Sequence, residues 1–250
     1  MKLISLNLWN GIMHEQLEKF ITNQQNKTDI FCFQEVRNGE YAIKDQGADE
    51  RTELFNEIKN WLPGFTGYFT EMKQGVGIAS FIKNNIAVEK IESNQILTEE
   101  ETKHLKMANG NSFYPRMIQS IYLKNGSLVI HNFHGLPGNF KKDTPERSLQ
   151  TKRLLTILND NPGSQILVGD FNLDINTEAI SQLSNKMRNL VQEGKFKTTR
   201  NSNYQKFNLL PFADYAFVSG DIKINNFTVL PDEVSDHLPL CLKFKSERNL

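Results

Sequence analysis

The chain has 250 residues, of which 38% are hydrophobic and 23% are charged. This composition excludes a disordered chain and supplies enough apolar material for a packed core, in one large domain or two small ones. Lys plus Arg and Asp plus Glu each number 29, so the formal net charge is zero. The balance excludes a positive field over the whole protein, and any attraction for phosphate must therefore be local.

Eight apolar runs rich in Ile, Val, Leu and Phe predict β-strands. They cover residues 2–8, 30–35, 77–82, 117–123, 127–134, 165–168, 215–219 and 238–244. Several runs are continuously apolar rather than alternating, which is typical of strands covered on both faces, as when two sheets pack together beneath outer helices. The runs therefore predict a layered α/β architecture.

Three segments between these runs have the periodicity of helices. Apolar residues recur on one face in 15–26 and in 51–62, as they do in amphipathic helices. The third segment has the clearest start signal, because Thr144 can cap a helix and Pro145 fits its first turn. We expect this third helix to run through Asn159.

The remaining segments indicate how the chain is organised. Residues 92–114 and 195–208 have no regular pattern, and we expect both to be long surface loops. The second of these segments mixes basic and aromatic residues. Because the chain has no internal repeat, no low-complexity tract and no long linker, we expect a single domain over residues 1–250.

The cysteines and the N-terminus bear on location. Cys32 and Cys241 both fall in predicted strands, which favours two buried thiols in a reducing compartment over a disulfide. Residues 1–6 lead directly into a strand pattern and lack the features of a secretory signal. No apolar run approaches the ~20 residues of a membrane-spanning helix. We expect a cytoplasmic protein without integral membrane association, with a monomer favoured.

Polar residues follow the ends of four apolar runs. They are Asn7, Glu35, His134, and Asp170 with Asn172. In α/β folds, ligand sites gather where strand ends converge, so these side chains can share one cleft. Carboxylate and amide oxygens without a Cys/His cluster of zinc spacing favour Mg²⁺, or Mn²⁺, over Zn²⁺. A hard cation in turn suggests phosphate chemistry.

Two late segments add groups for proton transfer. His237 stands beside Asp236 and supplies a cationic or proton-donating side chain, while Asp214 precedes an apolar run and could orient that ring. Any one of these residues alone is more often a cap or turn residue than a catalytic group. The full ordered set is much more specific, and it could hydrolyse a phosphoester.

Six short stretches repeat, in order, the motifs of a known family. They are Ser5-Leu6-Asn7, Phe33-Gln34-Glu35, Asn132-Phe133-His134, Gly169-Asp170-Phe171-Asn172, Asp214-Tyr215-Ala216-Phe217 and Ser235-Asp236-His237. Together they resemble the endonuclease/exonuclease/phosphatase superfamily. The resemblance implies a four-layer α/β sandwich, with two packed mixed β-sheets flanked by helices, and a Mg²⁺-dependent phosphoesterase.

The resemblance also implies roles for the metal and water. Glu35 is the expected principal Mg²⁺ ligand, with Asn7 beside it and Asp236 contributing directly or through water. The bound cation would neutralise phosphate charge. Asp170 would orient or deprotonate the attacking water, and Asn172 would help to hold the phosphate and the carboxylate.

Further roles concern the substrate. His237 would bind a non-bridging phosphate oxygen, with Asp214 fixing its ring. His134 is a candidate for phosphate contact or leaving-group protonation, and Asn132 of the same motif is a candidate substrate contact. Arg116 is either a phosphate contact or an exposed residue in a surface ion pair.

The substrate class stays open among three hypotheses. A nuclease acting on DNA or RNA ranks slightly first, because the segment 195–208 could contact backbone and stack bases. A hydrolase of a smaller phosphoester, such as a nucleotide, phosphoinositide or phospholipid headgroup, is the alternative. A catalytically silent module that binds phosphate ligands or protein partners is the third, and the intact motif set argues against it. Trp9 stands where the exonuclease III-like branch has an acidic residue, which argues against abasic-site cleavage.

Overall fold

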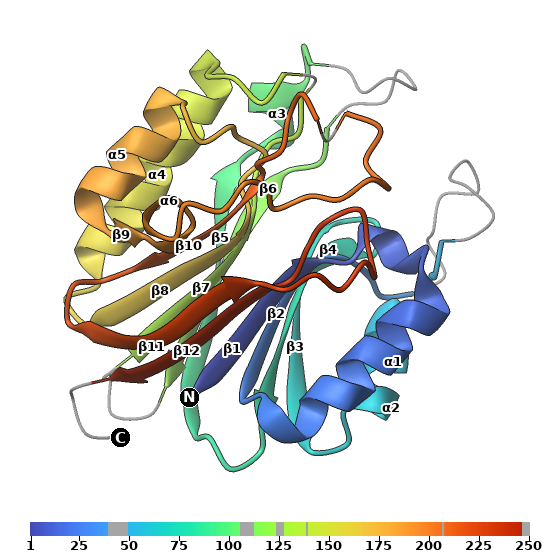
Figure 1. The fold of residues 1–250 in the computed structure, drawn as a ribbon. Coiled ribbons are helices and arrows are strands. Elements are labelled where there is room, and N and C mark those ends of the chain that lie inside the picture. Colours follow the sequence, from blue (N-terminus) through green and yellow to red (C-terminus); the bar gives the residue numbers. More distant parts are fainter. Residues whose placement is uncertain (40–49, 106–112, 124–127, 139, 207, 247–250) are drawn as a thin grey trace.

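Two six-stranded sheets pack face to face, with helices on their outer sides (Figure 1). The computed structural model describes residues 1–39, 50–105, 113–123, 128–138, 140–206 and 208–246. Each sheet contains one parallel pair among antiparallel neighbours. The fold is therefore the four-layer α/β sandwich with two mixed sheets that the sequence predicts.

The first sheet has the strand order β11-β12-β1-β2-β4-β3. Its strands are β11 (Ile222–Val229), β12 (Leu240–Ser246), β1 (Lys2–Asn7), β2 (Ile30–Arg37), β4 (Val76–Lys83) and β3 (Phe65–Lys73). The helices α1 (His14–Gln24) and α2 (Leu54–Trp61) cover its outer face, with short 3₁₀ turns at Trp9–Gly11 and Gln25–Lys27. Apolar side chains of both helices join those of β1, β2 and β4 in one core cluster, which is how an amphipathic helix is held on a sheet.

The second sheet has the strand order β5-β6-β7-β8-β10-β9. Its strands are β5 (Val88–Leu97), β6 (Arg116–Leu123), β7 (Leu128–His134), β8 (Ser164–Asp170), β10 (Asp214–Val218) and β9 (Arg188–Asn189). Its helices are α3 (Glu99–Thr102), α4 (Pro145–Asp160), α5 (Glu178–Lys186) and α6 (Leu190–Glu193). Thr144 caps α4 by accepting a hydrogen bond from the Arg147 N–H, as the sequence predicts.

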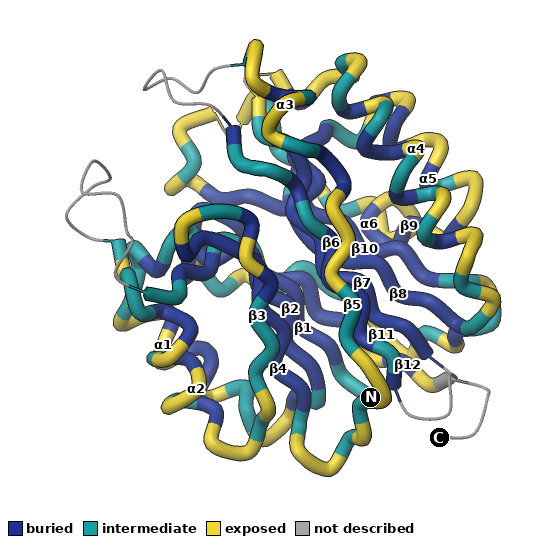
Figure 2. The backbone as a smooth tube through the Cα atoms, turned by 180° about the vertical axis from the view of Figure 1, so that it is seen from behind, coloured by how far each residue is buried: buried dark blue, intermediate teal, exposed yellow. Residues whose placement is uncertain are grey.

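The main core lies between the sheets and beneath α4 and α5. Most residues of the inner strands are buried, whereas the helices expose one face (Figure 2). The thiols of Cys32 and Cys241 are both buried and free, as expected. Among the residues that the structure describes, no helix has the length and apolar character needed to cross a membrane.

One predicted loop is wrong in part. Residues 92–97 form the end of β5, and Thr98 then caps α3 in a reciprocal capping box with Glu101. Residues 106–112 of the same predicted loop lie outside the described residues. The second predicted loop, 195–208, forms no helix or strand among its described residues, apart from a single β-bridge between Arg200 and His237.

The sheet packing sets the place of the functional residues. The parallel pairs β1–β2 and β7–β8 align Asn7 with Gln34 and His134 with Asp170. The two pairs also face each other across the sandwich, since β1 and β2 both contact β8. Their carboxyl ends therefore meet at one edge, as the pattern of polar strand ends predicts.

Candidate active site

A cleft of ≈ 1000 Å³ opens at this edge. Seven of the residues singled out from the sequence line it, namely Glu35, Arg116, His134, Asp170, Asn172, Asp236 and His237. Asn7 and Asp214 lie directly behind this lining and contact it through hydrogen bonds. The structure thus brings together nine of the ten predicted site residues.

Glu35 reaches the cleft because β2 is irregular at that point. The pairing of β2 with β4 shifts between Phe33 and Val36, and Glu35 has a φ of 54°. A bulge re-aims a side chain, and a left-handed φ is costly for a residue other than glycine, so such strain is often found at functional sites. Burial raises the pKa of Glu35, although a hydrogen bond from Asn7 opposes this effect.

Asn7 joins the two sheets at the floor of the cleft. Its Nδ2 donates to Glu35 Oε1 and to Asp170 Oδ2, both at 3.0 Å. Its Oδ1 accepts from the Trp9 N–H at 3.0 Å. The amide therefore holds the two carboxylates close together, which the sequence alone does not reveal.

Asp170 is fixed by the turn that follows β8. Asn172, with a φ of 55°, donates its backbone N–H to Asp170 Oδ1 at 2.8 Å and its side-chain amide to Oδ2 at 3.2 Å. Burial alone would raise the pKa of Asp170, but His237, Lys141 and other nearby cations outweigh it and hold the pKa well below its usual range. Asp170 is therefore an anion at neutral pH.

His237 and Asp214 form a buried pair. The ring Nδ1 lies 2.8 Å from Asp214 Oδ2, which also accepts from the Thr199 hydroxyl at 3.0 Å. The Nε2 atom is turned into the cleft, 3.7 Å from both Asp170 Oδ2 and Asp236 Oδ1. Burial and Arg200 lower the pKa of His237, but the surrounding carboxylates outweigh them and raise it, which favours the cationic ring.

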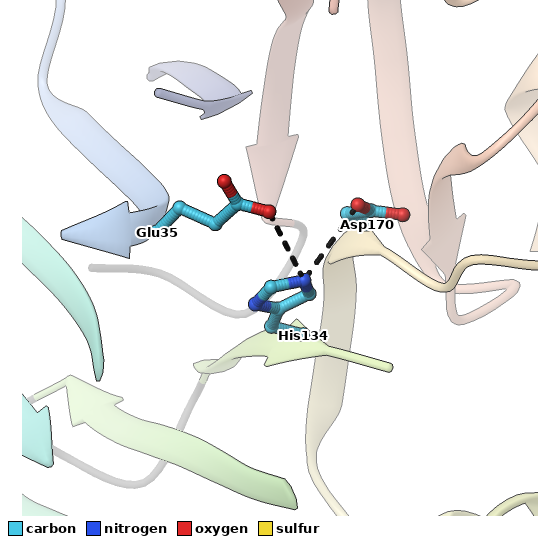
Figure 3. A group of neighbouring side chains, drawn as sticks. All are labelled: Glu35, His134 and Asp170. Carbon is cyan, nitrogen blue, oxygen red and sulfur yellow. Dashed lines mark ion pairs between the residues drawn. The ribbon is translucent and has the colours of Figure 1, made fainter. Parts of the chain in front are cut away.

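His134 points between two carboxylates (Figure 3). Its Nε2 lies 3.7 Å from Glu35 Oε1 and 3.7 Å from Asp170 Oδ2. Burial, together with the charge of Arg116, lowers its pKa to about 3, so the ring is neutral. No hydrogen-bond partner within the described part of the chain reaches its buried Nδ1.

Cationic side chains lie around the carboxylates of Glu35, Asp170 and Asp236, and two of these cations are not identified as site residues from the sequence. Arg116 is buried in the cleft wall, where burial lowers its pKa to about 10, and it donates to the carbonyls of Tyr114 and Gly135. Lys141 and Arg200 lie in segments without any regular sequence pattern. Arg200 pairs with Asp236 at 3.3 Å, and Lys141 Nζ donates to Asn172 Oδ1 at 2.6 Å.

The structure does not bring Asn132 to the cleft. Its side chain is fully buried between the sheets, where it donates to the carbonyls of Phe33 and Ala79 and accepts from Gln34. The β-strand alternation explains this position, because Asn132 and His134 share a face but Asn132 lies one full repeat deeper in β7. It cross-links the sheets and has no access to substrate.

The donor set fits a divalent cation. One oxygen each of Glu35 and Asp170 and one nitrogen of His134 lie within 4.8 Å of one another. Carboxylate oxygens suit Mg²⁺ and Mn²⁺, and a neutral imidazole is an acceptable ligand for Mn²⁺. The raised pKa of Glu35 fits as well, since a cation would favour its charged form.

This fold and this cluster define a class of phosphoesterases. The sequence model of the Endonuclease/Exonuclease/phosphatase family matches residues 4–237. The chain belongs to that family, whose members are hydrolases of phosphoester bonds.

Solved structures share the fold at low sequence identity. The mannosyl-6-phosphatase Bt3783 of Bacteroides thetaiotaomicron is 16% identical with a TM-score of 0.74, covering 98% of this chain and 99% of its own. The human Nocturnin catalytic domain with bound sulfate is 18% identical with a TM-score of 0.62, covering 98% and 93%. TDP2 from Caenorhabditis elegans is 18% identical with a TM-score of 0.67, covering 98% and 74%. No match to the chain is found among curated protein sequences.

Proposed function

We propose that this chain is a divalent-metal-dependent hydrolase of small phosphoesters. The observation that carries the proposal is the meeting of Glu35, Asp170 and the His237–Asp214 pair in one cleft. These groups come from both sheets and from strand ends far apart in the sequence. Together they supply a cation site, a carboxylate for water and a cationic hydrogen-bond donor.

Asp170 orients the attacking water. Its pKa is held low by the cations around it, so it is a weak base and acts mainly by accepting a hydrogen bond from the water and orienting it. The N–H and side-chain amide of Asn172 keep this carboxylate in one orientation. Water is thereby aimed without a large movement of the site.

His237 binds the phosphate. Asp214 accepts from its Nδ1 and leaves Nε2 free to donate to a non-bridging phosphate oxygen, where negative charge increases during the reaction. Arg116 adds a second buried donor in the cleft wall. Neutral His134 is placed to contact the phosphate or the leaving group.

Glu35 and Asp170, with Asp236 nearby, are the residues that would hold Mg²⁺, or Mn²⁺. The cation, when bound, supplies Lewis-acid neutralisation of phosphate charge. Asn7 keeps Glu35 and Asp170 at the spacing that this requires, through its two hydrogen bonds of 3.0 Å.

Two observations favour a small substrate over a polynucleotide. Within the basic and aromatic segment 195–208, the Phe196 ring packs edge-on against Phe227 on β11, and Arg200 pairs with Asp236. One aromatic and one basic side chain of the segment are therefore engaged by the protein itself rather than open to a nucleic acid. The formal net charge of zero agrees with this reading.

Hydrolysis of nucleic-acid phosphodiesters is the second candidate. The observation in its favour is the Tyr204 ring, which lines the cleft and is stacked by Arg200 at 3.8 Å, because aromatic rings in such clefts can stack nucleobases. The bound substrate would then lie across the cleft mouth beside this ring.

A substrate panel separates the two candidates. Turnover with Mg²⁺ or Mn²⁺ is measured in parallel on sugar phosphates, nucleotides, phosphoinositides, single-stranded DNA and single-stranded RNA. We expect turnover of small phosphoesters that chelator abolishes. Cleavage of DNA or RNA alone would replace the first candidate by the second. The absence of metal-dependent turnover on every substrate would contradict both and favour a silent binding module.

A further inference from the structure

Lys141 belongs to none of the sequence motifs, yet it lies inside the cleft. Its side chain is 2% exposed, and its Nζ donates to Asn172 Oδ1 at 2.6 Å. The Nζ also lies 6.0 Å from the centre of the Tyr204 ring. Lysine is rarely buried without a carboxylate partner, and within the described residues no carboxylate forms an ion pair with Lys141.

The backbone around Lys141 holds it in an unfavourable conformation. Its φ is 49°, and its carbonyl accepts from the Asp174 N–H at 2.8 Å. Both the left-handed φ and the burial of an ammonium group cost free energy, so the surrounding contacts must hold this arrangement in place. The neighbouring side chains of Phe140 and Lys142 are both exposed.

The constraint comes from the first turns of α4. Arg147, itself buried, donates from Nη1 to the Lys142 carbonyl at 2.6 Å and from Nη2 to the Leu136 carbonyl at 3.1 Å. Gln150 Oε1 accepts from the Leu136 N–H at 2.8 Å. The two ends of the loop 136–142 are therefore tied to one helix, and Lys141 is held between them.

The charges of the cleft can be paired one by one. His237 pairs with Asp214 and Arg200 pairs with Asp236. The remaining cations are Arg116 and Lys141, and the remaining carboxylates are Glu35 and Asp170. They interact through their charges over a distance and, among the described residues, form no ion pair with one another. These eight groups balance one another, and the buried Arg147, which also lines the cleft, adds one positive charge before any ligand binds.

A divalent cation held by the acidic residues would add two more positive charges to this excess. Buried charge is costly unless it is neutralised. A phosphomonoester dianion supplies two negative charges, whereas a phosphodiester supplies only one.

We propose that Lys141 is an additional phosphate-binding residue of this cleft and that, with Arg116, it selects substrates whose phosphate carries two negative charges. The inference rests on the proposed function and narrows its substrate class to phosphomonoesters. Lys141 would contact the phosphate from the side of the cleft where Asn172 lies, next to the end of β8. Arg147 is a positioning residue that acts through the loop.

The test compares two esters with the same leaving group, 4-nitrophenyl phosphate and bis(4-nitrophenyl) phosphate. We expect Lys141→Gln, which keeps a hydrogen-bond donor but removes the charge, to lower kcat/KM for the monoester by about 10- to 100-fold. The diester value should change by less than about 3-fold. Lys141→Arg should restore most of the selectivity, and Lys152→Gln, an exposed lysine of α4 outside the cleft lining, should leave both values unchanged.

Binding supplies a second readout without turnover. Inorganic phosphate should bind to the wild type in calorimetry about 10-fold or more tightly than to Lys141→Gln. If Lys141→Gln does not fold, Arg147→Lys keeps the charge but loosens the loop, and it should reduce the monoester preference.

Three results would overturn the inference. They are an equal loss on both esters, an unchanged monoester value in Lys141→Gln, and an unchanged preference in Arg147→Lys. Wild-type protein that hydrolyses both esters but fails these comparisons refutes only the role of Lys141. Wild-type protein that hydrolyses neither ester, and no substrate of the panel above, with metal refutes the proposed function itself.

Discussion

Asp170 is the side chain on which the contacts of the cleft converge. Its carboxylate accepts hydrogen bonds from Asn7 and Asn172, and the Nε2 atoms of His134 and His237 each lie 3.7 Å from its Oδ2. A buried carboxylate with this many donors and cations stays charged and keeps one orientation. Such a group can position water reproducibly.

His237 gives the first prediction at the scale of single residues. Replacing His237 with Ala removes the donor to the phosphate oxygen but leaves the two sheets intact, so turnover should fall by about 10²- to 10⁴-fold. Steady-state kinetics with circular dichroism checks both parts. His104→Ala is the control, because that ring is exposed and pairs with Glu146 outside the cleft. Near-wild-type turnover of a folded His237→Ala protein would remove His237 from the mechanism.

The sequence predicts most individual site residues but not how they touch. The Gly-Asp-Phe-Asn motif identifies Asp170, whereas its hydrogen bond with Asn7 joins residues 163 apart and depends on how the sheets pack. Lys141 and Arg200 belong to no motif and lie in loops that follow no hydrophobic period, and only the basic and aromatic composition of 195–208 points to Arg200. For Asn132 the motif predicts a contact with substrate, but the residue lies deep in β7. Its side chain instead forms hydrogen bonds to the other sheet.

At the scale of elements, strand position decides what the sequence reveals. The eight strands predicted from apolar runs are the eight interior strands of the two sheets, and the four missed strands are the edges β3, β11, β5 and β9. An interior strand is paired on both sides and mostly buried, so most of its residues are apolar, although β12 exposes Lys243 and Lys245. An edge strand is partly exposed, and β5 contains Glu89, Lys90 and Glu92 for that reason.

The end of β8 gives a prediction about stability. Gly169 has a φ of 142°, and a Cβ built there would lie 1.9 Å from the Phe133 carbonyl oxygen. Gly169→Ala should therefore cost at least about 3 kcal/mol in the free energy of unfolding, because backbone must move apart. Chemical denaturation measures this cost. Gly220→Ala, where nothing lies within 4 Å of the new Cβ, should change the stability little, and equal effects would contradict the argument.

The middle of β7 gives a prediction about pH. His131 faces away from the cleft, bonded to Ser120 and Gln165, and burial lowers its pKa to about 4. The unfolded chain, with a pKa of ~6.5, takes up the proton first as pH falls, so stability is lost between pH ~6.5 and about 4.

The size of this effect follows from the same shift. At pH 5 the buried His131 ring should cost roughly 2 kcal/mol relative to neutral pH. In His131→Gln the loss of unfolding free energy between pH 7 and pH 5 should be smaller by that amount. Urea denaturation at both values measures it, and an identical loss in the two proteins would show that His131 is not the group responsible.

At the scale of the whole molecule, the site exists only when both sheets are assembled. Leu3 and Ile30 of the first sheet share one core cluster with Ile130 and Leu167 of the second. The cleft takes Glu35 from β2 in the first sheet and Asp170 from the end of β8 in the second. We therefore expect cation binding to report on the folded sandwich as a unit.

Thermal denaturation tests this coupling. A divalent cation at 100 times its Kd should stabilise the wild type by about 2.7 kcal/mol, which corresponds to a rise in Tm of roughly 5 to 10 °C for a chain of this size. Glu35→Gln should abolish the rise because it removes the charge of the expected principal ligand. Glu178→Gln, an exposed acidic residue of α5, should retain it. A full rise in Glu35→Gln would place the cation elsewhere.

The most direct test of the central claim is metal-dependent turnover of a phosphoester by the wild type and by Asp170→Asn. The substitution keeps the shape of the side chain but removes the charge that orients water. We predict a fall of about 10³-fold or more in a variant that circular dichroism shows to be folded, and loss of wild-type turnover in chelator. Asp170→Asn turnover within about 10-fold of the wild type, or wild-type turnover that persists in chelator, would contradict the account.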